Sequence, residues 1–296
     1  MVDWLQPTPR DTPIEEMRAR YERDGYVWLK NVIPRSDVYD CREAYFKRIA
    51  AGKMLAPGTT PREGIFDQSL DPMHYQGLGA APETTSQEAL DRVHASKGYN
   101  DFLAHPALRD AVREFTGWKK ERLMKRGLIR HNVPKSKCPS GIHYDQLFLR
   151  AGDPVFVTAW VPIGDCPADA GGLMYLEKSC ELGEQIEERF KERQEKEKMP
   201  REERVSAFNR HMGELGHLSH NATEWAGSDG NGKRWLVADY EAGDVVFHHP
   251  WMIHSASRNT NREGKIRLAT DLRFYEEGAN ADERWNQNSF YHGDGL

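Results

Sequence analysis

The chain has 296 residues, which is enough to bury one large hydrophobic core, and we expect a single domain over residues 1–296. Its 41 lysines and arginines stand against 46 acidic residues, and this formal charge of −5 argues against a general nucleic-acid-binding protein, because such proteins usually carry a basic excess. The longest nearly apolar run, residues 155–163, is far shorter than the roughly 18 residues that a membrane span needs, so no membrane protein is expected.

Helices and loops are expected in the first part of the chain, about residues 1–121. Thr12 can cap the start of a helix with Pro13 in its first turn, and Gly25 can end that helix. This order of start and stop signals favours a helix. The expected elements are helices at 13–24, between Ser36 and Gly52, near 86–97 and near 106–115, a strand at 26–29, and a long loop at 54–83.

Strands dominate from about residue 122 to residue 277, and residues 278–296 form a tail. The expected strands lie at 123–131, 143–149, 154–163, 172–177, 235–239, 244–249 and 265–275. Strands that follow a helical flank predict a mainly β fold with flanking helices, a jelly-roll or cupin-like barrel.

An insertion at residues 180–232 interrupts this predicted barrel. From Glu184 to Arg204 charges of both signs alternate densely, which is typical of an exposed helix with salt bridges between its turns. The stretch that follows contains His211, His217, His220 and Trp225. Two interpretations stay open for the insertion: a lid that keeps water from a reactive site, or an inert surface addition.

His143 and Asp145 have the spacing of a metal site. Alternate residues of a strand share a face, so these two side chains can hold one ion while Tyr144 turns away. A second histidine must come from elsewhere, and His254 follows the predicted strand at 244–249. Two imidazoles and one carboxylate are typical of non-haem Fe(II) sites that leave positions open for a co-substrate and O2.

Two neighbouring histidines compete with His254 for the third ligand position. His248 and His249 lie in the same segment, and strand alternation alone does not separate His248 from His254. Thirteen residues after His254 comes Arg267, in a predicted strand whose apolar residues alternate. A buried arginine is costly unless it meets an anion, and a carboxylate fits its planar fork.

Several short motifs resemble the phytanoyl-CoA dioxygenase (PhyH-like) family. They are Gly243-Asp244-Val245-Val246-Phe247, His249-Pro250 with His254, Thr158-Ala159-Trp160-Val161-Pro162 and Gly171-Gly172-Leu173. The resemblance implies a double-stranded β-helix, an Fe(2+) ion, 2-oxoglutarate as co-substrate and O2. It also implies that His143, Asp145 and His254 are the iron ligands and that Arg267 binds the distal carboxylate of 2-oxoglutarate.

Thr158 and Ser255 are further candidates for co-substrate contact. Thr158 shares a strand face with Trp160, so core packing and contact with 2-oxoglutarate are both open. Ser255-Ala256-Ser257 stands where the family often has Gly-Ser-Gly. Which serine, if either, touches the co-substrate therefore stays open.

The resemblance implies a dioxygenase that oxidises a C–H bond of a small-molecule substrate, by hydroxylation, desaturation or rearrangement. We expect a specialised natural product; an acyl-CoA or a small polar metabolite is the alternative within the family. A zinc hydrolase or a binding protein without turnover are alternatives from other classes. Four cysteines without a Cys-x-x-Cys pair fit a reduced compartment, so we expect a cytoplasmic protein, which can form a homodimer.

Overall fold

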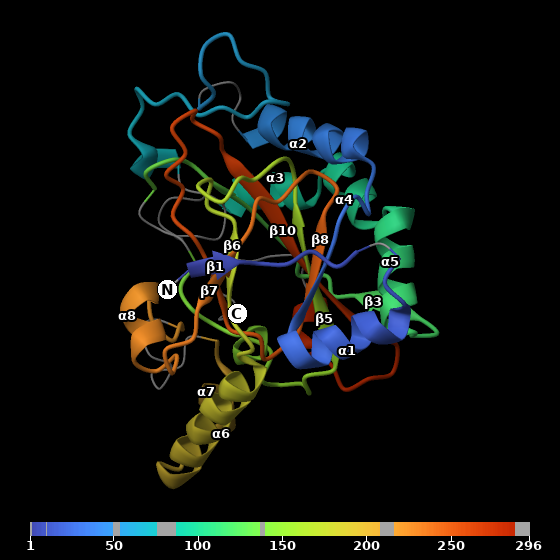
Figure 1. The fold of residues 1–296 in the computed structure, drawn as a ribbon, viewed down its shortest axis with the longest axis vertical. Helices are drawn as coiled ribbons and strands as arrows, with labels where there is room; N and C mark the ends of the chain where they lie inside the picture. Colours follow the sequence, from blue (N-terminus) through green and yellow to red (C-terminus); the bar gives the residue numbers. More distant parts are fainter. Residues whose placement is uncertain are drawn as a thin grey trace.

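Two β-sheets lie face to face at the centre of the structure, a computed structural model, and most helices flank the larger sheet (Figure 1). The structure describes residues 2–9, 11–49, 54–75, 87–136, 140–207 and 216–287. This arrangement confirms a mainly β fold with flanking helices, consistent with a jelly roll. Among the described residues, no helix combines the length and the apolar character that crossing a membrane requires.

The larger sheet has β10 at its centre, paired with three other strands. Its order is β2 (Tyr26–Leu29), β8 (Val245–His248), β5 (Phe156–Pro162), β10 (Arg267–Glu276) and β3 (Glu121–Leu123), and β4 (Leu128–Asn132) also pairs with β10. The smaller sheet has the order β1 (Val2–Trp4), β7 (Trp235–Val237), β6 (Leu173–Leu176) and β9 (His254–Ala256).

Helices cover the outer face of the larger sheet. They are α1 (Ile14–Asp24), α2 (Arg35–Ile49), α3 (Gln87–His94), α4 (Lys97–Leu103) and α5 (Pro106–Thr116), with a 3-10 turn, η1 (Pro72–Tyr75), beside them. Phe247 of β8 stacks on Phe115 of α5 with ring centroids 5.0 Å apart. Gly25 ends α1 in the left-handed conformation, at φ 82°, as its predicted role requires. The short α4 was not expected from the sequence.

Strand β10 divides its side chains between two environments. Leu268, Leu272 and Phe274 belong to the core under the helices. Ala269 belongs instead to the core between the two sheets, so Arg267 and Arg273, which share its side of the strand, also face inward. This strand therefore carries both a core face and the inward polar face on which the site depends.

The strand predicted at 143–149 is wrong. Only His143 makes a β-bridge, to His254, and a 3-10 turn, η3 (Asp145–Leu147), follows at once. Tyr144 and Leu147, three residues apart, are both fully buried in one apolar cluster, and a turn places both there whereas a strand would separate them. The strand predicted at 123–131 is also interrupted, between β3 and β4.

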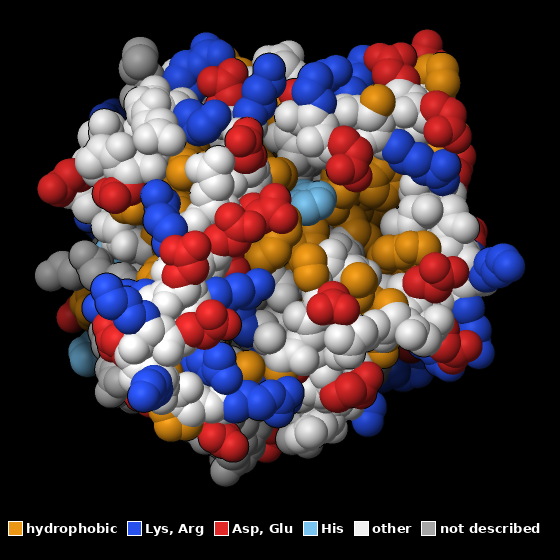
Figure 2. Space-filling model, turned by 90° about the horizontal axis from the view of Figure 1, so that it is seen from below, with side chains coloured by type: hydrophobic (Ala, Val, Ile, Leu, Met, Phe, Trp, Pro, Cys, Tyr) orange, Lys and Arg blue, Asp and Glu red, His pale blue; other side chains and the backbone are white. Residues whose placement is uncertain are grey.

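The insertion contains three described helices, α6 (Cys180–Lys196), α7 (Arg201–Val205) and α8 (Ala222–Gly227), so the single helix expected over 184–204 is broken. Figure 1 shows α6 projecting from one end of the molecule, and Figure 2, which views that end, shows a surface crowded with charges beside a hollow lined by apolar side chains. His211 lies outside the described residues.

The insertion is anchored to the segment that carries His143 and Asp145. On α6, Glu187 is buried; it accepts a hydrogen bond from the Tyr144 hydroxyl (2.6 Å) and two from the guanidinium of Arg150 (both 2.7 Å). Leu218 and Ser219 exchange backbone hydrogen bonds with Ile142, at 2.7 and 2.8 Å. The charged helix is thus more than a solvated face, because its buried carboxylate holds the residue between His143 and Asp145.

We predict that Glu187→Ala destabilises the protein by about 3 kcal/mol or more, because it leaves the Arg150 charge buried without its partner. Thermal and chemical unfolding would measure the loss, and iron affinity should fall with it because Tyr144 loses its anchor. Glu188→Ala, at an exposed position of the same helix, is the matched control. Equal stability of the two variants would contradict an anchoring role for Glu187.

Candidate metal centre

His143 and His254 are brought together by a backbone pairing between segments that are far apart in the sequence. The His143 N–H donates to the His254 carbonyl (3.0 Å), and the His254 N–H donates to the His143 carbonyl (2.8 Å). His254 follows the strand predicted at 244–249 and is the first residue of β9, in the smaller sheet. The two imidazole rings have centroids 4.3 Å apart.

Asp145 completes a cluster of three buried potential ligands. Its Oδ1 lies 4.0 Å from Nε2 of His143 and 3.8 Å from Nε2 of His254. One ligand atom from each of the three residues lies within 4.8 Å of the other two, a spacing at which one ion can contact all three. The structure therefore brings together the three residues that the sequence suggested as ligands.

Both histidines present the ring nitrogen that a metal needs. Nδ1 of His143 donates to the Gly141 carbonyl (2.7 Å), and Nδ1 of His254 donates to the Met252 carbonyl (2.8 Å). Burial lowers the pKa of His143 well below its usual value and that of His254 to about 4. Each ring is therefore neutral at pH 7 with its Nε2 lone pair facing Asp145, which suits a divalent ion such as Fe(II).

Each oxygen of Asp145 has its own partners. Oδ1, which faces the two imidazoles, accepts from Nη2 of Arg273 (2.8 Å). Oδ2 accepts from the Thr158 hydroxyl and lies 3.3 Å from Nε2 of His248. Burial alone raises the pKa of Asp145, but the charge of Arg273 and the His248 contact outweigh it and hold that pKa well below its usual range. Asp145 is therefore a carboxylate with one oxygen turned towards the candidate metal position.

His248 and His249 lie outside the cluster of three potential metal ligands. His248 is fully buried, with Nδ1 3.1 Å from the Tyr175 hydroxyl and Nε2 on the far oxygen of Asp145. The His249 ring packs against Tyr21, with centroids 5.4 Å apart. His254 alone of the three competing histidines joins His143 and Asp145 in the cluster.

Arg273 is a site residue that the sequence reasoning missed. It is buried, contacts Asp145 and stacks on the ring of Trp285 at 4.7 Å. Trp285 belongs to α9 (Arg284–Gln287), in the segment that we expected to be a tail. The signal was present in the alternation of β10, because the pattern that turned Arg267 inward turns Arg273 inward too.

Arg267 is the first residue of β10 and is 7% exposed. Its Nε donates to the Gly171 carbonyl (3.0 Å), at the segment that leads into β6. Among the described residues, no carboxylate is close enough to form an ion pair with Arg267. A buried guanidinium without an ion-pair partner is suited to bind an anionic ligand.

Ser255 and Thr158 have partners within the protein. The Ser255 hydroxyl donates to the Ser140 carbonyl (2.7 Å), on the face of β9 opposite to His254. Thr158, a candidate for contact with 2-oxoglutarate, donates its hydroxyl hydrogen to Asp145. His217 of the insertion lies next to the site, with its ring centroid 5.6 Å from that of His143.

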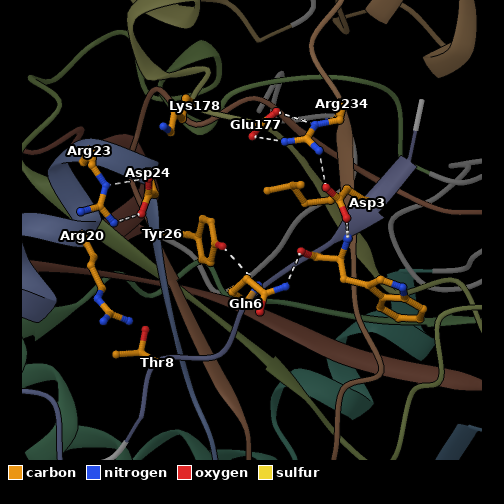
Figure 3. Close-up of a pocket in the computed structure, with 12 residues that line it drawn as sticks. Asp3, Gln6, Thr8, Arg20, Arg23, Asp24, Tyr26, Glu177, Lys178 and Arg234 are labelled. Atoms are coloured by element: carbon orange, nitrogen blue, oxygen red, sulfur yellow. Dashed lines mark hydrogen bonds and ion pairs between the residues drawn. The ribbon is translucent and has the colours of Figure 1, made fainter.

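A separate cavity of about 320 Å³ lies beside β1 and shares no lining residue with the three clustered ligands (Figure 3). Several of its charges pair with one another: Arg23 contacts Asp24 (2.5 Å), and Arg234 contacts Glu177 (2.7 Å) and Asp3.

Comparison with known proteins places this site in a family. The profile of phytanoyl-CoA dioxygenase (PhyH) matches residues 21–267. The 1-deoxypentalenic acid 11-beta-hydroxylase of Streptomyces arenae is 24% identical over 299 residues, covering 97% of this chain and 91% of the relative. The corresponding hydroxylase of Streptomyces exfoliatus is 23% identical, covering 98% of this chain and 92% of the relative.

Solved structures share the fold. The non-heme alpha-ketoglutarate-dependent carbocyclase SnoK from nogalamycin biosynthesis superposes with a TM-score of 0.53 at 19% identity, covering 92% of this chain and 87% of the other. The epimerase SnoN, in complex with Fe3+, alpha-ketoglutarate and nogalamycin RO, superposes with a TM-score of 0.53 at 18% identity, covering 89% and 83%. The chain belongs to the phytanoyl-CoA dioxygenase family and is a non-haem enzyme that depends on iron and 2-oxoglutarate.

Proposed function

We propose that His143, Asp145 and His254 hold the Fe(II) ion, that Arg267 binds the distal carboxylate of 2-oxoglutarate, and that the enzyme oxidises a C–H bond of a small natural product. The observation that carries the metal assignment is the convergence of two neutral imidazoles on one oxygen of a buried carboxylate. The relatives named as hydroxylases of 1-deoxypentalenic acid support a small-molecule substrate.

The protein residues position the reactants, while iron with 2-oxoglutarate and O2 supplies the oxidising chemistry. Thr158 and His248 occupy the far oxygen of Asp145, which favours binding of the metal through the other oxygen only. The carbonyls of Gly141 and Met252 hold the two imidazoles in the tautomer that offers Nε2. Three ligands fixed in this way leave the remaining positions around the metal for co-substrate and O2.

The reaction class can be tested without knowing the substrate. The purified protein should release succinate only when Fe(II), 2-oxoglutarate and O2 are present together, and a metabolite extract that contains the substrate should raise the rate. A product heavier by one oxygen atom or lighter by two hydrogens would identify the outcome by mass spectrometry. Release of succinate without O2, or none under any condition, would contradict the proposal.

The metal assignment predicts a sharp contrast among the histidines. His143→Ala, Asp145→Ala and His254→Ala should each abolish turnover and weaken Fe(II) binding strongly, because each removes one of the three protein ligands. His249→Ala should bind iron as the wild type does, and His248→Ala should retain the metal because its ring holds only the far oxygen of Asp145. Iron content after equilibrium dialysis under argon measures this. Normal iron binding by His254→Ala would refute the assignment of the third ligand.

The co-substrate assignment predicts that Arg267→Lys raises the apparent dissociation constant of 2-oxoglutarate by about tenfold or more while Fe(II) stays bound, because lysine keeps the charge but loses the planar fork. Anaerobic titration of the metal-to-ligand charge-transfer band measures the change. Arg258→Lys, an exposed arginine on the loop between β9 and β10, is the control. If both variants bind 2-oxoglutarate like the wild type, Arg267 has no such role.

A further inference from the structure

Arg130 lies on the face of the larger sheet that turns towards the smaller one, beside the residues of the proposed site. In the pairing of β4 with β10, Arg130 is opposite Ala269, and Asn132 is opposite Arg267. Directly opposite residues of an antiparallel pair point to the same face, and Ala269 packs between the two sheets. Arg130 therefore points to the interior that also contains Arg267 and Arg273.

The guanidinium of Arg130 has a buried nitrogen that is not satisfied within the described residues. Its Nε is buried without a hydrogen bond, and no carboxylate of the described chain lies within ion-pair distance. Arg273 likewise has two buried nitrogens, Nε and Nη1, without a hydrogen-bond partner. A buried hydrogen-bond donor without a partner destabilises the folded protein unless a ligand accepts its hydrogen.

The charges around Arg130 are unbalanced. Burial lowers its pKa, and the neighbouring charges of Arg267, Arg273 and Arg126 lower it further, while only Asp271 acts in the opposite direction. Asp271 belongs to the same face of β10, opposite Leu128.

Counting formal charges shows what is missing. On the inward faces of β4 and β10 with Asp145, three arginines meet two aspartates, Asp145 and Asp271. The two positive charges of Fe(II) and the two negative charges of 2-oxoglutarate cancel. These five side chains therefore keep one positive charge in excess after metal and co-substrate are bound, and an anionic group on the substrate would compensate it.

We propose that Arg130 forms a second anion-binding subsite, distinct from the co-substrate subsite at Arg267, and that it receives a carboxylate or similar singly charged anionic group of the substrate. This inference rests on the proposed function. It names the substrate class as an organic acid whose apolar body extends towards the metal.

Along β10, the position opposite Arg130 lies between those of Arg273 and Arg267. Arg273, which contacts Asp145, marks the metal side of the strand. Ala269, opposite Arg130, follows along the strand, and Arg267 lies beyond it. Four residues of strand separate positions 273 and 269, a distance of roughly 13 Å along the backbone. The carbon that such an acid presents to the metal would therefore lie several bonds from its carboxylate, beside the bound 2-oxoglutarate.

The test compares an acid with its ester, so that charge is the only large difference. Adamantane-1-carboxylate and its methyl ester would each be titrated, without O2, into protein loaded with Fe(II) and 2-oxoglutarate, with binding read from the charge-transfer band and by calorimetry. The wild type should bind the acid about tenfold or more tightly than the ester. Arg130→Met should lose this preference and bind the ester unchanged, whereas Arg130→Lys should keep part of it.

Arg122→Met is the matched control, because Arg122 lies on β3 of the same sheet, is about half exposed and pairs with Glu277 at the surface. Absence of acid binding by the wild type, or an acid preference that survives in Arg130→Met, would overturn the subsite. A tenfold weaker affinity of Arg130→Met for 2-oxoglutarate would overturn it as well, by assigning Arg130 to the co-substrate. Loss of the charge-transfer band in the wild type would instead contradict the proposed function itself.

Discussion

The burial of one carboxylate, Asp145, is the constraint on which the rest of the site depends. A fully buried anion is unfavourable unless charges and hydrogen bonds compensate for the lost hydration. Arg273 supplies the charge, and Thr158 and His248 supply hydrogen-bond donors from two neighbouring strands of the larger sheet. Two of these partners are in turn held, Arg273 by Trp285 and His248 by Tyr175, so residues that are far apart in the sequence converge on one side chain.

This arrangement also explains why the two sheets must meet at this point. His254 starts a strand of the smaller sheet, whereas Thr158, His248 and Arg273 belong to the larger one. The segment with His143 and Asp145 lies between them, pairs with His254 and is held from outside by Glu187 of α6. Displacement of either sheet would therefore separate the ligands, and the insertion contributes to holding them rather than serving only as a surface addition.

Much of the site followed from local pattern, because alternation on a strand is a local property. The period of β10 predicted that Arg267 points inward, and the motif around His254 predicted a ligand in that segment. The same logic failed at 143–149, because Tyr144 and Leu147, three residues apart, enter one apolar cluster, and a 3-10 turn satisfies that spacing. The contact between Arg273 and Asp145 joins residues 128 positions apart, and no local pattern reports such a pairing.

The central claim is that iron is bound by Nε2 of His143, Nε2 of His254 and one oxygen of Asp145. A crystal structure of the protein grown without O2, with Fe(II) and 2-oxoglutarate, tests it most directly. The account predicts metal contacts from Oδ1 of Asp145 alone, with Oδ2 still held by Thr158 and His248. Coordination by His248, or by both oxygens of Asp145, would contradict it.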